Sequence, residues 1–362
     1  MKVMHVVGNR PQFIKLAPVS REMRKRNIEE IIIHTGQHYD KNMSDIFFEE
    51  LGIPKPTRNL NVGSGSHAQT TAKAMIALEE VMTEYNPQCV IIYGDTNSTL
   101  AAALTAAKLC IPMIHVEAGI RTNNKKNPEE CNRIVADHLS GYLCTPDRIS
   151  VDNLKQEGID EKKIHFTGDV MFDEFLYCAS QENASEYLKK YPKDYILMTW
   201  HRQENTDSRE RMEKIIDFIE QVKYPIVLPL HPRTKKKIVE YGFESRIQKN
   251  SNLIITEPVG YLEMVSLLKN CKCIITDSGG ASKEASFAGK RCIFLLDLEV
   301  WPELIESGWI QILNFKDANS VKTSMEIISA AINSDNKKDK GDFFGDGNAA
   351  EKIVDIVEMI LN

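Results

Sequence analysis

Short apolar runs rich in β-branched residues alternate with amphipathic stretches through almost the whole chain, and this alternation constrains the fold most. In the first half, buried strands are predicted at 3–7, 31–34, 90–93 and 113–116, with helices at 14–24, 68–84 and 98–109. Strands and helices that alternate in this way form right-handed βαβ units, whose parallel sheet is covered by helices on both faces. The sequence therefore predicts an α/β fold.

The same pattern restarts near residue 195. Strands are predicted at 196–200, 226–230, 253–255, 273–276 and 292–295, and helices at 209–222, 261–269 and 282–288. The polar stretch 180–194 has few β-branched residues and a Tyr-Pro break, so it is the predicted crossover between two domains. A length of 362 residues fits two cores of roughly 150–200 residues each. A last amphipathic helix is predicted at 349–361.

Composition and charge exclude several classes of protein. Lys and Arg number 45 against 51 Asp and Glu, a balance that argues against a nucleic-acid binder and requires any bound anion to be held by local donors. No apolar run approaches the roughly 20 residues that span a membrane, and the N-terminus has no secretory signal pattern. The eight cysteines fit buried thiols of a cytoplasmic protein, and Cys271 and Cys273 lack a second ligand pair, so no metal site is predicted.

Positive charge follows the first predicted strand. In open parallel sheets ligands bind beyond the carboxyl ends of the strands, so the residues at these ends are the first candidates for a site. Here Gly8 precedes Arg10 and Lys15, which bring two cations to the start of a helix, a position suited to phosphate. The segment is not Gly-x-Gly-x-x-Gly, so neither a dinucleotide nor any other cofactor is predicted.

Three carboxylates follow neighbouring elements of the first half. Asp95 comes after the strand at 90–93, Glu117 after the strand at 113–116, and Glu129 opens a helix that also carries Arg133. Each acid alone has an ordinary explanation as a helix cap or a dipole partner. Together they converge on one sheet edge, and grouped carboxylates beside cations are able to divide the roles of acid and base.

The second half offers an anion site. His201 and His231 each follow a predicted strand and each has an Arg within two residues, a pattern that favours anion binding. At Ser278-Gly279-Gly280 a strand ends and a helix begins, which exposes backbone N–H groups in the arrangement that cradles a diphosphate. Glu284, one turn further on, is placed to accept hydrogen bonds from ribose hydroxyls.

These segments resemble the non-hydrolysing UDP-N-acetylglucosamine 2-epimerases along essentially all of residues 1–362. The resemblance implies a glycosyltransferase-B type fold: two Rossmann-like domains, 1–180 and 181–345, that face each other across a cleft, with a C-terminal segment, 346–362, that crosses back to the first. It also implies a homodimer that serves the synthesis of cell-surface polysaccharide. The matching motifs are GNRPQFIKLAPV, HTGQHYD, YGDTNSTLAA, HVEAGIRT, NPEECNR, HRQEN and TDSGGASKEA.

The resemblance implies a reaction without redox chemistry. UDP leaves the sugar as the C2 proton is removed, and UDP adds back to the resulting 2-acetamidoglucal after a proton reaches the opposite face of C2. The implied catalytic residues are Asp95, Glu117, Glu129 and His201, and the implied substrate-binding residues are Arg10, Lys15, Arg133, His231, Ser278, Gly279, Gly280 and Glu284, with Lys15 supporting the carboxylates.

Several alternatives stay open. Many family members carry Arg-Asp-x-Thr-Glu-Arg-Pro-Glu where this chain has LDLEVWPE, and Trp301 in that stretch resembles a sister branch that acts on UDP-2,3-diacetamido-2,3-dideoxyglucuronate. A regulatory UDP-sugar position is implied at Gln37, His38 and Gln69, although Asp40 and Ala68 depart from some members. A hydrolysing epimerase, a glycosyltransferase of the same fold and a non-catalytic sugar-nucleotide sensor are the remaining alternatives.

Overall fold

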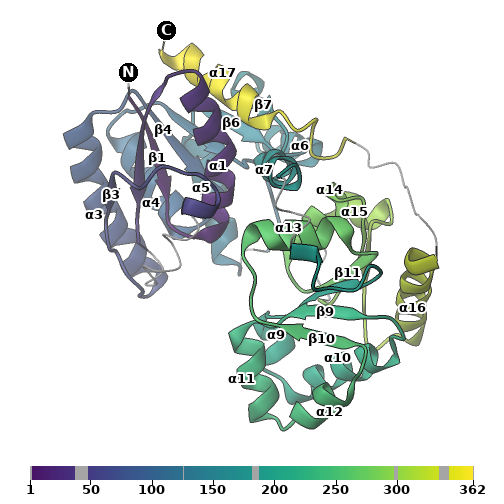
Figure 1. Ribbon diagram of the computed structural model, residues 1–362. Helices are drawn as coiled ribbons and strands as arrows, with labels where there is room; N and C mark the ends of the chain where they lie inside the picture. Colours follow the sequence, from purple (N-terminus) through teal and green to yellow (C-terminus); the bar gives the residue numbers. More distant parts are fainter. Residues whose placement is uncertain are drawn as a thin grey trace. The chain divides into compact units, whose positions relative to one another are not determined.

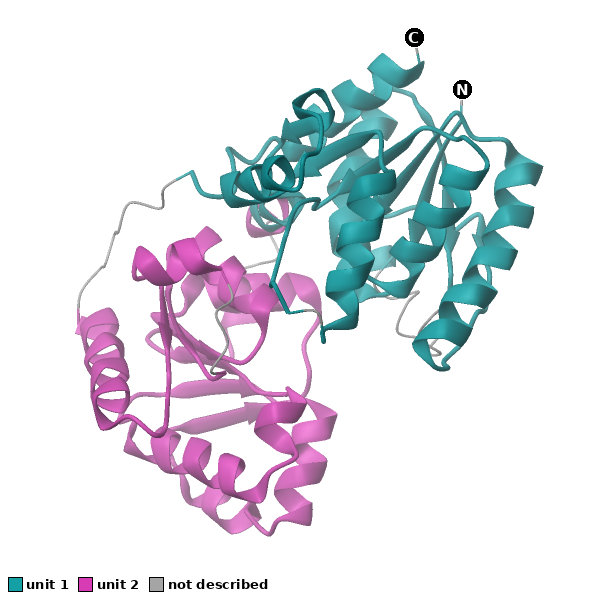
Figure 2. Ribbon diagram, turned by 180° about the vertical axis from the view of Figure 1, so that it is seen from behind, with its two compact units in different colours: residues 1–176, 342–362 teal, residues 177–341 magenta. Residues whose placement is uncertain are grey.

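The computed structural model describes residues 2–36, 48–124, 126–181, 187–296, 301–333 and 342–361. The chain forms two compact units (Figure 2): unit 1 contains Met1–Leu176 and Asp342–Asn362, and unit 2 contains Tyr177–Gly341. The sequence predicts domain boundaries near residues 180 and 345. Each unit is built on a parallel sheet, as the alternating pattern predicts.

Unit 1 contains a seven-stranded parallel sheet in the order β3-β2-β1-β4-β5-β6-β7. The order reverses between β1 and β4, which is where parallel α/β sheets bind their ligands. The strands are β1 Lys2–Val7, β2 Glu29–His34, β3 Arg58–Asn59, β4 Cys89–Tyr93, β5 Met113–Val116, β6 Tyr142–Thr145 and β7 Ile164–Phe166.

The helices of unit 1 include one from the far end of the chain (Figure 1). The C-terminal helix α17 packs along α1, as the resemblance implied, and buries Ile353, Val354 and Val357. Arg26 at the end of α1 adds ion pairs to Asp355 (2.6 Å) and to Glu358 (2.9 Å). The helices are α1 Arg10–Lys25, α3 His67–Tyr85, α4 Asn97–Lys108, α5 Pro128–Leu139, α6 Arg148–Gln156, η1 Glu161–Lys163, α7 Val170–Ala179 and α17 Ala349–Leu361.

Unit 2 contains a six-stranded parallel sheet in the order β10-β9-β8-β11-β12-β13, which reverses between β8 and β11. The strands are β8 Ile196–Thr199, β9 Ile226–Pro229, β10 Leu253–Thr256, β11 Cys273–Thr276, β12 Arg291–Phe294 and β13 Ile310–Ile312. The helices are α9 Gln203–Thr206, α10 Arg209–Gln221, α11 Pro232–Glu240, α12 Glu244–Lys249, α13 Tyr261–Asn270, α14 Gly279–Phe287, α15 Pro302–Glu306 and α16 Ala318–Asn333.

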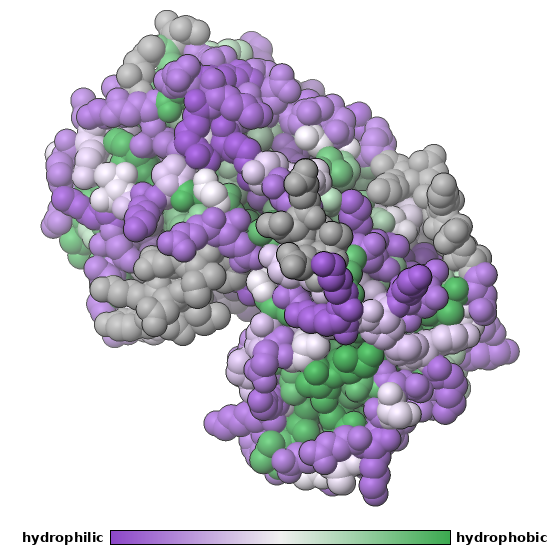
Figure 3. Space-filling view, in the orientation of Figure 1, coloured by the Kyte–Doolittle hydropathy of each residue, from purple (hydrophilic) through white to green (hydrophobic). Residues whose placement is uncertain are grey.

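The surface in Figure 3 is mostly hydrophilic, and apolar side chains gather over the part of unit 2 where Figure 1 places β9 and β10. The outer strand β10 contributes to this exposure, since Ile255 is 41% exposed. No helix in the described part of the chain is long and apolar enough to cross a membrane.

The structure corrects two predicted helix starts. Helix α1 begins at Arg10, four residues before the predicted start, because the Asn9 side chain caps it and Pro11 fits its first turn. Helix α14 begins at Gly279 because Ser278 Oγ accepts a hydrogen bond from Ala281 N (3.3 Å). The two glycines of the predicted cradle are therefore the first two residues of the helix itself.

The eight cysteines are free, and six of them are buried, as predicted for most. Burial raises the pKa of Cys89 to about 12, so this thiol stays protonated at neutral pH. Among the described residues, no group of three or more His, Cys, Asp or Glu side chains is arranged to hold a metal ion.

A buried carboxyl group fixes the start of α17. Asp173 Oδ2, on α7, accepts a hydrogen bond from Ala350 N (2.7 Å). Burial raises the pKa of Asp173 to about 6, and the nearby Asp169 and Asp346 act in the same direction. The folded state therefore binds this proton more tightly than the unfolded chain, whose aspartate has a pKa of 3.8. The contribution of this group to the free energy of unfolding is complete below pH 3.8, and it is lost as the pH rises through about 6.

We expect Asp173→Asn to become more stable than the wild type as the pH rises. Asparagine still accepts the hydrogen bond but never ionises, so the advantage of the variant should grow by about 2 kcal/mol between about pH 4.5 and pH 8. Urea unfolding at both pH values measures this difference. Asp152→Asn, an exposed position on α6, is the matched control. A stability difference for Asp173→Asn that does not change with pH would contradict the prediction.

Candidate active site

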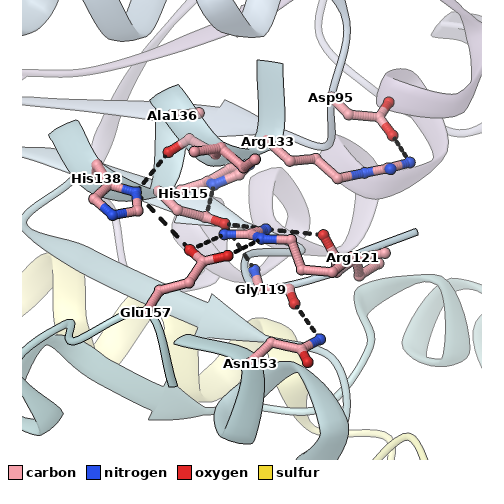
Figure 4. A network of polar contacts seen from close by, with 12 residues as sticks. Asp95, His115, Gly119, Arg121, Arg133, Ala136, His138, Asn153 and Glu157 are labelled. Atoms are coloured by element: carbon pink, nitrogen blue, oxygen red, sulfur yellow. Dashed lines mark hydrogen bonds and ion pairs between the residues drawn. The ribbon is translucent and has the colours of Figure 1, made fainter. Parts of the chain in front are cut away.

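The first predicted carboxylate, Asp95, lies just beyond β4 and is held by a fixed cation. Arg133 on α5 places one guanidinium nitrogen 2.5 Å from Asp95 Oδ2 (Figure 4). Its other guanidinium nitrogen lies 3.0 Å from Glu130 Oε2. The cap of α4 is Thr96, whose side chain accepts from Thr99 N. Asp95 is thus not needed as a helix cap, which removes the ordinary explanation for its presence.

The second guanidinium nitrogen of Arg133 is held by a carboxylate, Glu130, that the sequence analysis did not select. Glu130 is buried and accepts hydrogen bonds from Thr122 N, Thr122 Oγ1 and Asn123 N. Burial opposes its ionisation, but the hydrogen bonds from Thr122, Arg133 and Asn123 outweigh burial and hold the pKa of Glu130 below its ordinary value. Glu130 therefore serves as a structural anion that orients Arg133.

The second carboxylate, Glu117, follows β5 and pairs with Lys15 from α1. Both side chains are about nine-tenths buried. Gly94 makes room for the pair, because a Cβ on this residue would lie 3.0 Å from Lys15 Nζ and 3.2 Å from Glu117 Oε2. Glu117 itself has a positive φ of 71°, a conformation that only its surroundings can enforce on a side chain of this size.

The third carboxylate, Glu129, differs from the other two. It lies in the first turn of α5, where its backbone N–H donates to Asn127 Oδ1 (3.2 Å). Within the described ranges its carboxylate oxygens have no hydrogen bond or ion pair with another residue. One carboxylate is thus open to an incoming group, while the other two are fixed by cations.

Two amide side chains that the sequence did not single out fix the loops around this site. Gln12 is buried, its Oε1 accepts from Gly8 N (2.7 Å), and its Nε2 donates to Tyr93 O (2.7 Å). Asn132 Nδ2 donates to the carbonyl oxygen of Asp95 (2.8 Å). Their positions inside the motifs GNRPQFIKLAPV and NPEECNR are the sequence signal for these two residues.

Two other predicted positions of unit 1, Arg10 and Gln69, lie in the described residues. Arg10 is exposed at the first position of α1. Gln69 belongs to the capping box of α3, where its Oε1 accepts from Ser66 N (3.2 Å). Gln37 and His38, the other two residues of the implied regulatory position, lie outside the described residues.

In unit 2 the loop after β8 is fixed by Asp277, which sequence reasoning did not select. This carboxylate is fully buried and accepts from the backbone N–H groups of His201 (3.0 and 3.1 Å) and Arg202 (2.9 Å). His201 Nδ1 also lies 3.3 Å from Asp277 Oδ1, and its imidazole side chain remains 37% exposed. The exposed ring is thus held at one edge by a buried anion.

His231 lies beside this ring, with the two ring centroids 5.4 Å apart. It caps α11, because its Nδ1 accepts from Arg233 N (3.2 Å). A neutral His231 therefore carries its proton on Nε2. The structure brings the two predicted histidines together at neighbouring strand ends.

The glycines of the predicted diphosphate cradle are not required by the packing of the protein. A Cβ on Gly279 would meet nothing within 4 Å, and a Cβ on Gly280 would meet only Ser278 Oγ, at 3.9 Å. Trp301 Nε1 donates to Gly279 O (3.0 Å), which holds the first turn of α14 in place. Among the described residues the space beside both glycines is therefore open, as close approach of a phosphate to the N–H groups of this helix start requires.

Glu284 lies further along α14 and is buried. Its Oε1 accepts a hydrogen bond from Tyr261 OH (2.9 Å). The tyrosine fixes the orientation of this carboxylate, the residue that the sequence assigns to ribose binding.

Comparison with known proteins relates the whole chain to one family. Residues 21–358 match the family model of the UDP-N-acetylglucosamine 2-epimerases. The chain is 44% identical to a UDP-N-acetylglucosamine 2-epimerase homolog of Methanococcus maripaludis and 41% identical to the UDP-2,3-diacetamido-2,3-dideoxy-D-glucuronate 2-epimerase of Pseudomonas aeruginosa, in both cases over 99% of this chain and 100% of the relative.

A solved structure is similar over the same length. The crystal structure of the Methanocaldococcus jannaschii UDP-GlcNAc 2-epimerase in complex with UDP-GlcNAc and UDP has a TM-score of 0.85 at 39% identity, over 99% of this chain and 100% of that one. The two α/β units are thus of the glycosyltransferase-B type that the resemblance implied. The chain belongs to the UDP-N-acetylglucosamine 2-epimerase family, a family of isomerases.

Proposed function

We propose that this protein interconverts UDP-N-acetylglucosamine and UDP-N-acetylmannosamine by eliminating UDP and adding it back, and that the product supplies the synthesis of cell-surface polysaccharide. The observation that carries the proposal is the set of three carboxylates in unit 1, two held by cations and one open. The family resemblance further supports a homodimer that acts in the cytoplasm.

The reaction requires two proton transfers and no oxidant. A carboxylate takes the proton from C2 while the bond between C1 and the UDP oxygen breaks, which leaves a C1–C2 double bond and UDP. A carboxylic acid then gives a proton to the opposite face of C2, and the UDP oxygen attacks C1. Since a neutral C2–H is a very weak acid, loss of the proton must be coupled to departure of the stabilised diphosphate.

The pairing of the carboxylates supports a division of roles among them. Asp95 and Glu117 each have a permanent cation, Arg133 and Lys15, which fixes their position. Glu129 has oxygens that are not engaged by any other described residue, so it is able to accept or deliver a proton without first breaking an ion pair.

Unit 2 supplies the proposed contacts to UDP. The uncovered N–H groups after Ser278, at Gly279 and Gly280, fit a diphosphate, and Glu284 fits a ribose hydroxyl. His201 is the proposed partner of the departing diphosphate, because its ring is accessible and oriented by Asp277. Arg10 and His231 are the remaining proposed contacts to the substrate.

A second substrate is favoured by one comparison. The Pseudomonas aeruginosa relative, 41% identical over its full length, is a UDP-2,3-diacetamido-2,3-dideoxy-D-glucuronate 2-epimerase. We therefore consider this uronate as the alternative substrate for the same reaction.

Product analysis after separate incubation with the two UDP-sugars tests the proposal. We expect UDP-N-acetylglucosamine to reach an equilibrium with its manno epimer, with no free sugar released. If only the uronate is turned over, the substrate is the uronate and not UDP-N-acetylglucosamine. Release of free N-acetylmannosamine with UDP would identify a hydrolysing enzyme. Transfer of the sugar to an added acceptor would identify a glycosyltransferase, and UDP binding without turnover of either sugar would identify a sensor.

A further inference from the structure

We infer that His115 is a buried imidazolium that positions the backbone beside both Asp95 and Glu117, a role that rests on the function proposed above. His115 is fully buried in β5 and touches neither carboxylate side chain in any contact that the structure defines. It is therefore a positioning residue, and its effect must pass through the groups that its two ring nitrogens hold.

Both ring nitrogens face acceptors. His115 Nδ1 lies 2.6 Å from Asp137 Oδ1, and Nε2 lies 2.7 Å from the carbonyl oxygen of Gly94. A carbonyl oxygen cannot donate, and the carboxylate of Asp137 already accepts from two other donors. A neutral imidazole has only one N–H. The lone pair of its second nitrogen would then face the lone pairs of an oxygen atom at hydrogen-bond distance, which is repulsive. Only the doubly protonated ring satisfies both contacts.

The charges around the ring lead to the same conclusion (Figure 4). Asp137 is also fully buried, and its Oδ2 pairs with Arg121 (2.7 Å) and accepts from Gly119 N (3.1 Å). Arg121 is shared with Glu157, to which it donates at 2.6 and 2.8 Å. Two carboxylates thus share one guanidinium, and a charged His115 balances the second negative charge of this group, in which the Glu157 side chain is 28% exposed.

Another titratable neighbour of this group among the described residues, His138 on α5, contributes little. Its Nδ1 lies 3.9 Å from Glu157 Oε2, and its side chain is 46% exposed. Burial opposes ionisation of Asp137, but His115 and Arg121 outweigh burial and hold the pKa of Asp137 below its ordinary value. Asp137 is therefore the carboxylate that His115 balances.

The network reaches the backbone on both sides of the site. His115 holds the carbonyl of Gly94, the residue before Asp95, and Gly94 has a positive φ of 59°. Asp137 holds His115 and Gly119, the residues two before and two after Glu117. Because Glu117 also has a positive φ, the backbone at this point depends on contacts that enforce its conformation.

Ring N–H signals of protein labelled with ¹⁵N-histidine test the charge directly. The resonances of His115 are assigned by their loss in His115→Gln, and we expect two ring N–H protons on this residue in the folded protein. In Asp137→Asn the amide is able to donate to Nδ1, so we expect a neutral ring that carries only its Nε2 proton. One ring proton in the wild type would overturn the inference. No substrate is needed, so this result is independent of the proposed function.

Kinetics test the positioning role. Asp137→Asn keeps the shape of the network, so we expect a fall in kcat of at least about tenfold with a KM within about threefold of the wild type. His115→Gln leaves an unbalanced carboxylate and should lower the melting temperature by several degrees, and adding Asp137→Asn should restore the melting temperature but not kcat. His138→Gln, on the same helix as Asp137, is the control and should keep both values. An unchanged kcat in Asp137→Asn would overturn the positioning role.

Discussion

Asp95→Asn should lower the turnover of the UDP-sugar by a factor of at least about 10² while UDP binds with nearly the wild-type affinity. Asparagine keeps the size of the side chain and an oxygen for Arg133, but it can neither accept nor deliver the proton that the reaction moves. The proposed UDP contacts lie in unit 2, so the loss should appear in kcat. Steady-state kinetics and calorimetric titration with UDP measure the two quantities.

A matched control separates this effect from a loss of charge in general. Asp152→Asn removes one exposed carboxylate from α6 of the same unit, and it should change neither turnover nor UDP affinity. Since Asp95→Asn also weakens the ion pair with Arg133, the melting temperature of each variant should be measured alongside. If turnover by Asp95→Asn equals that of the wild type, Asp95 takes no part in the proton transfers.

The double substitution Gly279→Ala with Gly280→Ala should weaken UDP binding by at least about tenfold without loss of stability. An added Cβ meets no atom within 4 Å at Gly279 and only Ser278 Oγ, at 3.9 Å, at Gly280, so the fold has room for both methyl groups. Alanine also favours the helical conformation more than glycine does, by about 1 kcal/mol in a helix interior. The methyl groups should instead obstruct the approach of the diphosphate to the helix N–H groups.

Calorimetry with UDP and thermal unfolding give the two readouts for this variant. Gly141→Ala in unit 1 is the matched control, because a Cβ there meets only Met113 O, at 3.8 Å, and this glycine lies outside the proposed UDP contacts. We expect the control to keep both the affinity and the melting temperature. Wild-type UDP affinity in the double variant would show that the start of α14 does not hold the diphosphate.

The sequence was sufficient to predict the sheet ends at which the candidate site residues lie. Asp95 and Glu117 follow adjacent parallel strands, β4 and β5, so a common edge follows from strand order alone. Their partners could not be predicted in the same way. Whether Lys15 or Arg133 reaches a given carboxylate depends on how α1 and α5 pack on the sheet, which local sequence does not determine.

The residues that sequence reasoning missed are mostly polar side chains buried against one another. His115 lies inside an apolar strand pattern, and Asp137 lies in a polar helix whose acids suggest a solvated face. Asp277 stands within a recognised motif, but its role depends on the loop after β8, more than 70 residues earlier. Such pairs become visible only when the tertiary structure brings the two segments together. The strands β3, β6, β7 and β13 were not predicted either; they have only two to four residues each, and none forms a continuous β-branched run.

In the proposed reaction the C2 proton leaves the sugar and is replaced from solvent while UDP departs and returns. Incubation of the protein with UDP-N-acetylglucosamine in D₂O, followed by NMR at C2, measures this exchange. We expect deuterium at C2 in the UDP-manno epimer, and in the recovered UDP-N-acetylglucosamine as the reaction approaches equilibrium. Formation of the manno epimer with the original proton still at C2 would contradict the proposed reaction.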